Sequence, residues 1–294
     1  MSHSTVLVIV DHAKNAKDAE KQAEERLESF DENIEVEPYA DGEVTFEEFK
    51  KALYDDGSVP EEEMLSRFNN PNEKDARALE EDLYENDLRI VDGKYVRFTT
   101  YNPKARWDWY QLGGRWEGLL PSKSKGKGVD VIQKKDLDLV GAKERAIKEA
   151  NEAYDKFENL KAGRNAGPSF EDIVDAIDPT VPESDKYQLA RAEYNANPVV
   201  RDASKEFGLY FTSPHDYFKI GKGGRYAFVE SASTAFIETH ALLNGDGDWL
   251  EIGRMLMFAV TADPMDEKEW SRIFWNQIND ADDDAWFLVY DLHI

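Results

Sequence analysis

Two strand–helix–strand patterns, one near each end of the chain, constrain the fold more than any other feature of the sequence. The first pattern has three segments: a β-branched run at 5–10, a helical stripe at 15–30 and a strand at 34–39. The second also has three: a strand at 254–261, a helix at 266–279 and an aromatic strand at 286–290. Each helix has an apolar stripe at three- and four-residue spacing, which must be buried against a sheet.

Two such units side by side form one four-stranded sheet covered by two helices. The sequence therefore predicts an α+β protein with a ferredoxin-like βαβ–βαβ core, built from residues 1–39 and 254–294. Residues 40–253 would be a large mixed insertion that carries a hairpin with the sequence GGRW at 113–116. We expect the two chain ends to share one sheet although more than 200 residues separate them.

The insertion contains predicted helices and predicted short strands. Helices are expected at 45–86 with breaks, at 140–160 and at 184–196. A hairpin is expected at 88–101, because Asp92-Gly93 is a strong turn signal between apolar strands. Further strands are expected at five places: 107–120, 129–132, 209–212, 225–230 and 234–242.

The charge of the chain limits its partners. Asp and Glu number 61 against 36 Lys and Arg, which gives a net charge of −25 and makes direct binding to nucleic acid unfavourable. Three interpretations fit this charge: a solubilising surface, a decoy that imitates the charge of DNA or RNA, and adaptation to high salt. Cysteine is absent, which excludes disulfides and thiolate metal sites and fits the cytoplasm. No apolar run reaches the length of a membrane span, so no membrane partner is expected.

No motif names a reaction, and whether the chain is an enzyme stays open. The GxSxG, HExxH, Walker and Rossmann fingerprints are absent, and the five histidines are not paired at zinc-ligand spacing, so no metal and no cofactor is predicted. Residues 37–48 imitate an EF-hand loop, but Tyr39 stands where an oxygen ligand is needed. His293 and Asp291 lie two residues apart on one face of the last strand. Asp291 would orient the imidazole of His293, or the two side chains would form a partly exposed polar pair at the end of the strand.

The most informative segment is 101–135, which carries eight Lys or Arg and three Asp or Glu within an acidic chain. We predict an anion site here, in which two glycines let the backbone approach closely and an arginine binds phosphate or carboxylate. The predicted anion-binding residues are Gly113, Gly114, Arg115, Lys123, Lys125 and Lys127. The predicted aromatic wall consists of Trp107, Trp109 and Trp116. The alternative is an aromatic core hairpin in which Arg115 pairs with a carboxylate.

Two carboxylates follow this segment. Asp136 and Asp138 alternate along the chain, so their side chains would lie on one side of a strand or turn. Paired carboxylates bind a metal or act as general acid and base. The alternative interpretation is that one of them caps the helix expected at 140–160.

Several sequence blocks occur in a distinctive order: FDENIEVEPY at 30–39, NPKARWDWYQLGGRW at 102–116, KKDLDL at 134–139 and WFLVYDLHI at 286–294. Together they resemble a family of uncharacterised tailed-bacteriophage and prophage proteins with a WDWYxxGGRW core motif. The resemblance spans most of the chain, although the late hairpin at 233–255 departs from the usual pattern.

The resemblance implies a phage gene that is expressed in the cytoplasm of the bacterial host. By analogy with other phage accessory genes, it implies a binding protein that inhibits or modulates a host or anti-phage defence component. The alternative function is an enzyme or sequestering protein for a phosphorylated small molecule, which would use the GGRW segment and the lysines that follow it.

Overall fold

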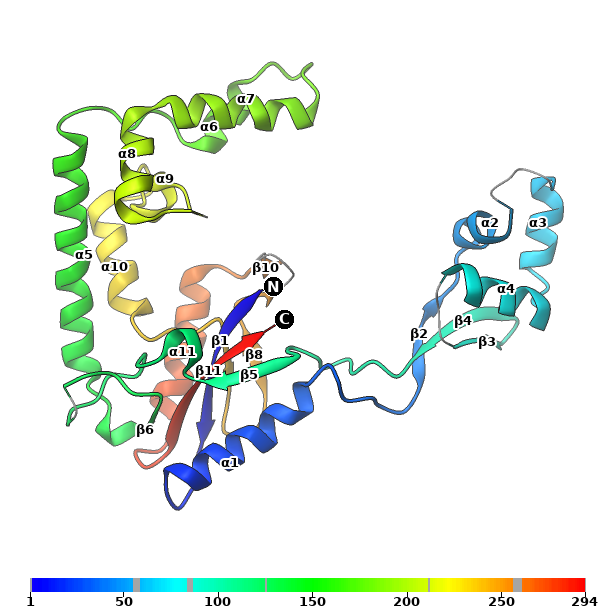
Figure 1. Ribbon diagram of the computed structural model, residues 1–294, viewed down its shortest axis with the longest axis horizontal. Coiled ribbons are helices and arrows are strands. Elements are labelled where there is room, and N and C mark those ends of the chain that lie inside the picture. The colour runs from blue at the N-terminus through cyan, green and yellow to red at the C-terminus, as the bar shows by residue number, and fades with distance from the viewer. Residues whose placement is uncertain are drawn as a thin grey trace. The chain divides into compact units, whose positions relative to one another are not determined.

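The structure is a computed structural model that describes residues 2–54, 59–83, 87–124, 126–210, 212–255 and 261–293. It has a mixed α+β fold, which confirms the predicted class (Figure 1). The chain divides into two compact units. The first contains Met1–His3, Glu24–Tyr110 and Leu292–Ile294, and the second contains Ser4–Ala23 and Gln111–Asp291. The predicted division into a core at 1–39 and 254–294 and an insertion at 40–253 remains untested, because two compact units do not show which segment is inserted into which.

The larger sheet has six strands, with β5-β11-β1-β7-β8 in order and β6 also paired with β11. These strands are β1 (His3–Val10), β5 (Trp109–Leu112), β6 (Val131–Gln133), β7 (Ala241–Leu243), β8 (Trp249–Glu251) and β11 (Trp286–His293). Strand β1 pairs in parallel with β7, whereas β6 runs antiparallel to β11. The β-branched run of β1 is almost fully buried, as expected for a strand covered on both faces. Strands β1 and β11 are neighbours, so segments from both ends of the chain share one sheet, as predicted.

Two helices confirm the helical patterns at the chain ends. Helix α1 (Ala16–Leu27) is followed by a 3-10 turn, and helix α11 (Glu267–Asp280) begins after Asp266, whose side chain accepts a hydrogen bond from Lys268 N at 2.9 Å. Helix α11 buries an apolar stripe in the main core of the second unit. That stripe consists of Trp270, Phe274 and Ile278, and it packs with Leu7, Phe287 and Val289 of β1 and β11.

The ferredoxin-like arrangement is not confirmed. The predicted strand at 34–39 is not formed, and β2 (Tyr39–Glu43) pairs with β4 of another sheet. Pro38 has no N–H to donate to a ladder, which disfavours a central strand at this position. At the other end, β9 (Arg254–Met255) and β10 (Thr261–Ala262) form a two-stranded sheet. The rest of the strand predicted at 254–261 lies outside the described residues.

The first unit contains a small lobe at residues 39–99, which we call the acidic lobe. A sheet in the order β2-β4-β3 carries helices on one face (Figure 1). These elements are β3 (Leu88–Val91), β4 (Lys94–Thr99), α2 (Phe46–Tyr54), α3 (Glu61–Phe68) and α4 (Glu73–Leu83). The predicted hairpin is confirmed, and Asp92 and Gly93 take positive φ values of 50° and 74°, as a two-residue hairpin turn requires. Phe49, Leu79 and Tyr95 form the centre of the core of the lobe.

Helices make up the rest of the second unit. Their bounds are α5 (Leu139–Lys161), α6 (Phe170–Ala176), α7 (Glu183–Ala196), α8 (Pro198–Phe207), α9 (Pro214–Tyr217) and α10 (Gly224–Ala235). The structure confirms the helices predicted at 140–160 and 184–196. The strand predicted at 225–230 is wrong, because this segment forms α10, which packs along α5. Short apolar runs fit a helix and a strand equally well, so periodicity alone did not separate them.

Candidate functional site

The two glycines of the GGRW segment fit the backbone around carboxylates of the fold. Strand β5 ends at Leu112, and Gly113 and Gly114 then take φ values of 70° and 54° before a 3-10 turn. A Cβ atom on Gly113 would lie 2.7 Å from the carboxyl carbon of Asp130, and one on Gly114 would overlap Asp291. The backbone here donates to both carboxylates, from Gly118 N to Asp130 at 2.7 Å and from Arg115 N to Asp291 at 3.1 Å. Only glycine combines this conformation with such close approach.

The side chain of Arg115 is exposed at the surface of the second unit. Its guanidinium makes no ion pair with any residue in the described part of the chain. The structure therefore gives no support to the alternative in which Arg115 pairs with a carboxylate of the chain. Whether Arg115 binds an anion stays a prediction.

The three tryptophans differ in their environments. Trp107 is 5% exposed, and its Nε1 donates to the carbonyl oxygen of Leu27 at 3.2 Å. Trp109 is 49% exposed. Trp116 packs against the main core of the second unit. Two of the three side chains are thus used in packing, and Trp109 alone among them has a largely open surface.

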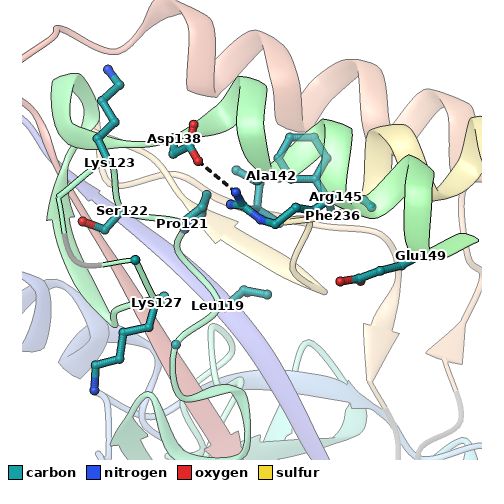
Figure 2. Close-up of a pocket in the computed structure, with 15 residues that line it drawn as sticks. Leu119, Pro121, Ser122, Lys123, Lys127, Asp138, Ala142, Arg145, Glu149 and Phe236 are labelled. Carbon is teal, nitrogen blue, oxygen red and sulfur yellow. Dashed lines mark hydrogen bonds and ion pairs between the residues drawn. The ribbon is translucent and has the colours of Figure 1, made fainter.

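A cavity of about 420 Å³ lies between the loop at 121–128, which we call the lysine loop, and helix α5 (Figure 2). Backbone hydrogen bonds between Leu120 and Val129, at 2.8 and 3.1 Å, close the base of the loop. Lys123 and Lys127 line the cavity, whereas Lys125 lies outside the described residues. The Nζ of Lys123 donates to the carbonyl oxygen of Lys135 at 2.6 Å, which holds this side chain against the protein. Arg115 is not among the described residues that line this cavity.

Helix α5 supplies the opposite wall. Asp138 caps the helix by accepting from Gly141 N at 3.0 Å, as the capping interpretation predicted. Asp138 also accepts a hydrogen bond from Arg145 Nη1 at 3.1 Å. Asp136 is exposed in a 3-10 turn and does not line the cavity among its described residues, so the two carboxylates do not face one ligand. Sequence reasoning missed Arg145 and Glu149, which lie two and three helical turns after the cap on the side facing the loop.

A second polar pair lies in the first unit. His293 Nδ1 lies 2.6 Å from Asp108 Oδ1, and the ring of His3 packs edge-on against His293. Nε2 of His293 is buried and has no hydrogen-bond partner among the described residues. Sequence reasoning paired His293 with Asp291, whereas the structure places Nδ1 of His293 against Asp108 and gives Asp291 a hydrogen bond from Arg115 N. Asp108 is 185 residues away from His293, so no local pattern indicated this contact.

The EF-hand-like segment at 37–48 contains strand β2 and ends in the cap of helix α2. Glu48 accepts hydrogen bonds from the backbone N and the hydroxyl of Thr45, at 2.8 and 2.7 Å. The backbone N–H of Thr45 is the main cause that lowers the pKa of Glu48 to about 2. Among the described residues, no three acidic or histidine side chains form a group that could hold a metal ion.

The fold and the cavity define an α+β protein of two units, whose larger unit has a cavity lined by Lys123, Lys127 and Arg145. Searches against protein-family models, curated proteins and solved structures found no match to this chain. None of the described helices combines the length and the apolar character needed to cross a membrane.

Proposed function

We propose that the chain is a phage-encoded accessory protein that acts in the bacterial cytoplasm by binding and inhibiting or modulating a host or anti-phage defence protein. The acidic lobe is the surface that makes this contact. The observation that supports the proposal is the unbalanced charge of the lobe, which folds around its own apolar core.

Most lysines and arginines of the acidic lobe form ion pairs with carboxylates of the same lobe. Residues 39–99 contain 17 Asp or Glu and 8 Lys or Arg, so the lobe has a net charge of 8 − 17 = −9. Five of those cations form ion pairs within the lobe: Lys50–Glu61, Arg67–Asp75, Arg89–Asp87, Lys94–Glu43 and Arg97–Glu48. Seven exposed carboxylates make no ion pair with the described residues: Asp41, Glu47, Glu62, Glu63, Glu73, Glu81 and Asp92.

A basic protein surface has the charge that complements these carboxylates. Complementary charge accelerates encounter and excludes partners of the same sign. Proteins that bind nucleic acid have such surfaces, since they neutralise phosphates with Lys and Arg. The decoy interpretation of the acidic composition therefore agrees with the location of the free carboxylates, and a partner that binds DNA or RNA is the class that the lobe fits best.

Capture from phage-infected bacteria tests this proposal. The wild-type chain is compared with a lobe variant that carries Glu62→Gln, Glu63→Gln, Glu73→Gln and Glu81→Gln. A control variant removes the same number of exposed carboxylates from the second unit: Asp246→Asn, Asp282→Asn, Asp283→Asn and Asp284→Asn. We expect the lobe variant to lose the captured protein in quantitative mass spectrometry, and the control variant to retain it. Equal capture by all three chains would contradict the proposal.

The phosphorylated-ligand function has less support in the form predicted from the sequence. That form placed the anion at Arg115, whereas the cavity beside the lysine loop is lined by Arg145 of helix α5. The cavity is therefore considered separately below, since it does not depend on the acidic lobe.

A further inference from the structure

We propose that the cavity between the lysine loop and helix α5 binds a small phosphorylated sugar or nucleotide, with Arg145 and Lys127 holding the phosphate and Glu149 accepting from the hydroxyl groups. The cavity volume of about 420 Å³ suits a ligand of this size. The site lies wholly within the second unit and is independent of the protein partner proposed above.

Arg145 has hydrogen-bonding capacity to spare. A guanidinium carries five N–H donors in a planar fork, and the described structure uses one of them, from Nη1 to Asp138 at 3.1 Å. Figure 2 shows the guanidinium extending from α5 toward Asp138 and Pro121. The contact with Asp138 fixes the direction of the side chain, and the remaining donors can bind phosphate oxygens bidentately.

The lysine loop supplies the second cation. Its backbone is anchored next to the cavity, where Lys123 N donates to the carbonyl oxygen of Asp136 at 3.0 Å. Lys127 is exposed and makes no ion pair with any described residue. Figure 2 shows its side chain extended away from Arg145, and its flexible four-carbon stem lets the ammonium swing toward a bound phosphate. A phosphate dianion would then contact Arg145 on helix α5 and Lys127 on the lysine loop, one cation from each wall of the cavity.

The rest of the lining favours a ligand with hydroxyl groups. Glu149 lies one turn after Arg145 on the same side of α5, and an ionised carboxylate accepts hydrogen bonds only. Leu119, Ala146 and Phe236 supply apolar surface to the same cavity. The charged lining residues are Lys123, Lys127, Arg145, Asp138 and Glu149, a local net charge of 3 − 2 = +1 in a chain of −25. This balance favours an anionic ligand at this place.

Isothermal titration calorimetry tests the site with three probes: inorganic phosphate, ribose 5-phosphate and adenosine 5′-monophosphate. Adenosine, which lacks the phosphate, is the negative control. We expect the wild type to bind the phosphorylated probes, and Arg145→Gln to weaken binding by about tenfold or more, since charge-assisted hydrogen bonds are lost. The matched control is Lys148→Gln on the same helix, because Lys148 is 76% exposed and pairs with Glu152 outside the cavity. This control variant should bind like the wild type.

The probes separate the two ligand sources. Tighter binding of ribose 5-phosphate identifies a sugar phosphate, and tighter binding of adenosine 5′-monophosphate identifies a nucleotide. If Arg145→Gln lowers the melting temperature, Lys127→Gln replaces it as the test variant, since Lys127 has no partner to lose among the described residues. The proposal is overturned if no phosphorylated probe binds at millimolar concentration, or if these variants bind as tightly as Lys148→Gln. Neither result bears on the acidic lobe.

Discussion

At the scale of single residues, Asp130 and Asp291 organise the segment with the most distinctive sequence. Both carboxylates accept from backbone N–H groups that the turn at Gly113 and Gly114 brings to them. Asp291 is 2% exposed, so the backbone N–H of Arg115 replaces water as a hydrogen-bond donor to its carboxylate. The glycine pair is therefore explained by the fold, and a sequence motif of this kind marks a backbone constraint as readily as a ligand site.

Replacing Gly114 tests that explanation. Gly114→Ala adds a Cβ atom that overlaps Asp291 and forces a residue with a side chain into positive φ. Gly247→Ala is the matched control, because Gly247 has a φ of 87° with no atom near its Cβ position. We expect Gly247→Ala to cost about 1 kcal/mol of unfolding free energy and Gly114→Ala clearly more, as measured by urea denaturation. Equal losses would show that Asp291 moves aside freely.

His240 predicts a pH dependence of stability. Burial lowers the pKa of His240 below its ordinary value of 6.5, and a backbone hydrogen bond with Gly253 and the Glu251 carboxylate offset this only in part. The unfolded chain therefore binds more protons near and below pH 6.5, so the stability that His240 contributes is present above that pH and is lost as the pH falls. We expect His240→Asn to flatten the fall in unfolding free energy between about pH 7.5 and 5. An unchanged slope in parallel denaturant titrations would refute this assignment.

At the scale of elements, the start of helix α5 combines a structural and a chemical role. Asp138 satisfies the backbone of the first turn and holds Arg145 beside the cavity. Gly141 is needed in this turn, because a Cβ atom there would overlap the Asp138 carboxylate.

Substitutions at Asp138 and Asp136 test which of the two carboxylates caps helix α5. Asp138→Ala should lower the unfolding free energy by about 1 kcal/mol, the usual cost of losing an N-cap. Asp138→Asn should come close to wild type, because an amide oxygen also caps. Asp136→Ala is the control, since Asp136 is exposed in the preceding turn. Thermal or urea denaturation of the three variants measures the difference, and a loss at Asp136 as large as that at Asp138 would be inconsistent with the cap.

Long periodic helices and the hairpin marked by Asp92-Gly93 could be predicted from the sequence, whereas several other short elements could not. Helices α1, α5, α7 and α11 have enough turns for an apolar stripe to be recognised. The segment 225–230 is a short apolar run that fits a strand and a helix equally well, and packing against α5 selects the helix. Tertiary contacts decided the candidate site in the same way. Arg145 lies in unremarkable helical sequence, and Asp108 lies in the distinctive WDWY block, but the contacts of both residues appear only in the folded structure.

At the scale of the whole molecule, charge is unevenly distributed. The acidic lobe carries a net charge of −9, whereas the lining of the cavity has an excess of one positive charge. The net charge of the chain follows from its composition. The sequence did not indicate which carboxylates of the lobe remain unpaired, because the ion pairs form only in the folded lobe.

This distribution predicts how the two proposed ligands respond to salt. A basic partner bound through exposed carboxylates should dissociate as salt rises, because charges separated by more than about 10 Å are screened at 0.1 M ionic strength. Titration of the captured partner at low and high sodium chloride concentrations measures the effect. We expect the affinity to fall steeply, and the lobe variant to lose most of that salt dependence. An affinity independent of salt would point to an apolar interface.

The strand order of the larger sheet has a consequence for synthesis on the ribosome. Strand β1 has β7 and β11 as neighbours, and both come more than 200 residues later in the chain. The nascent chain therefore exposes an unpaired apolar strand for most of its translation, and such an edge is prone to aggregate. Residues 3–10 therefore lack both of their native strand neighbours until residues 241–243 and 286–293 have been synthesised.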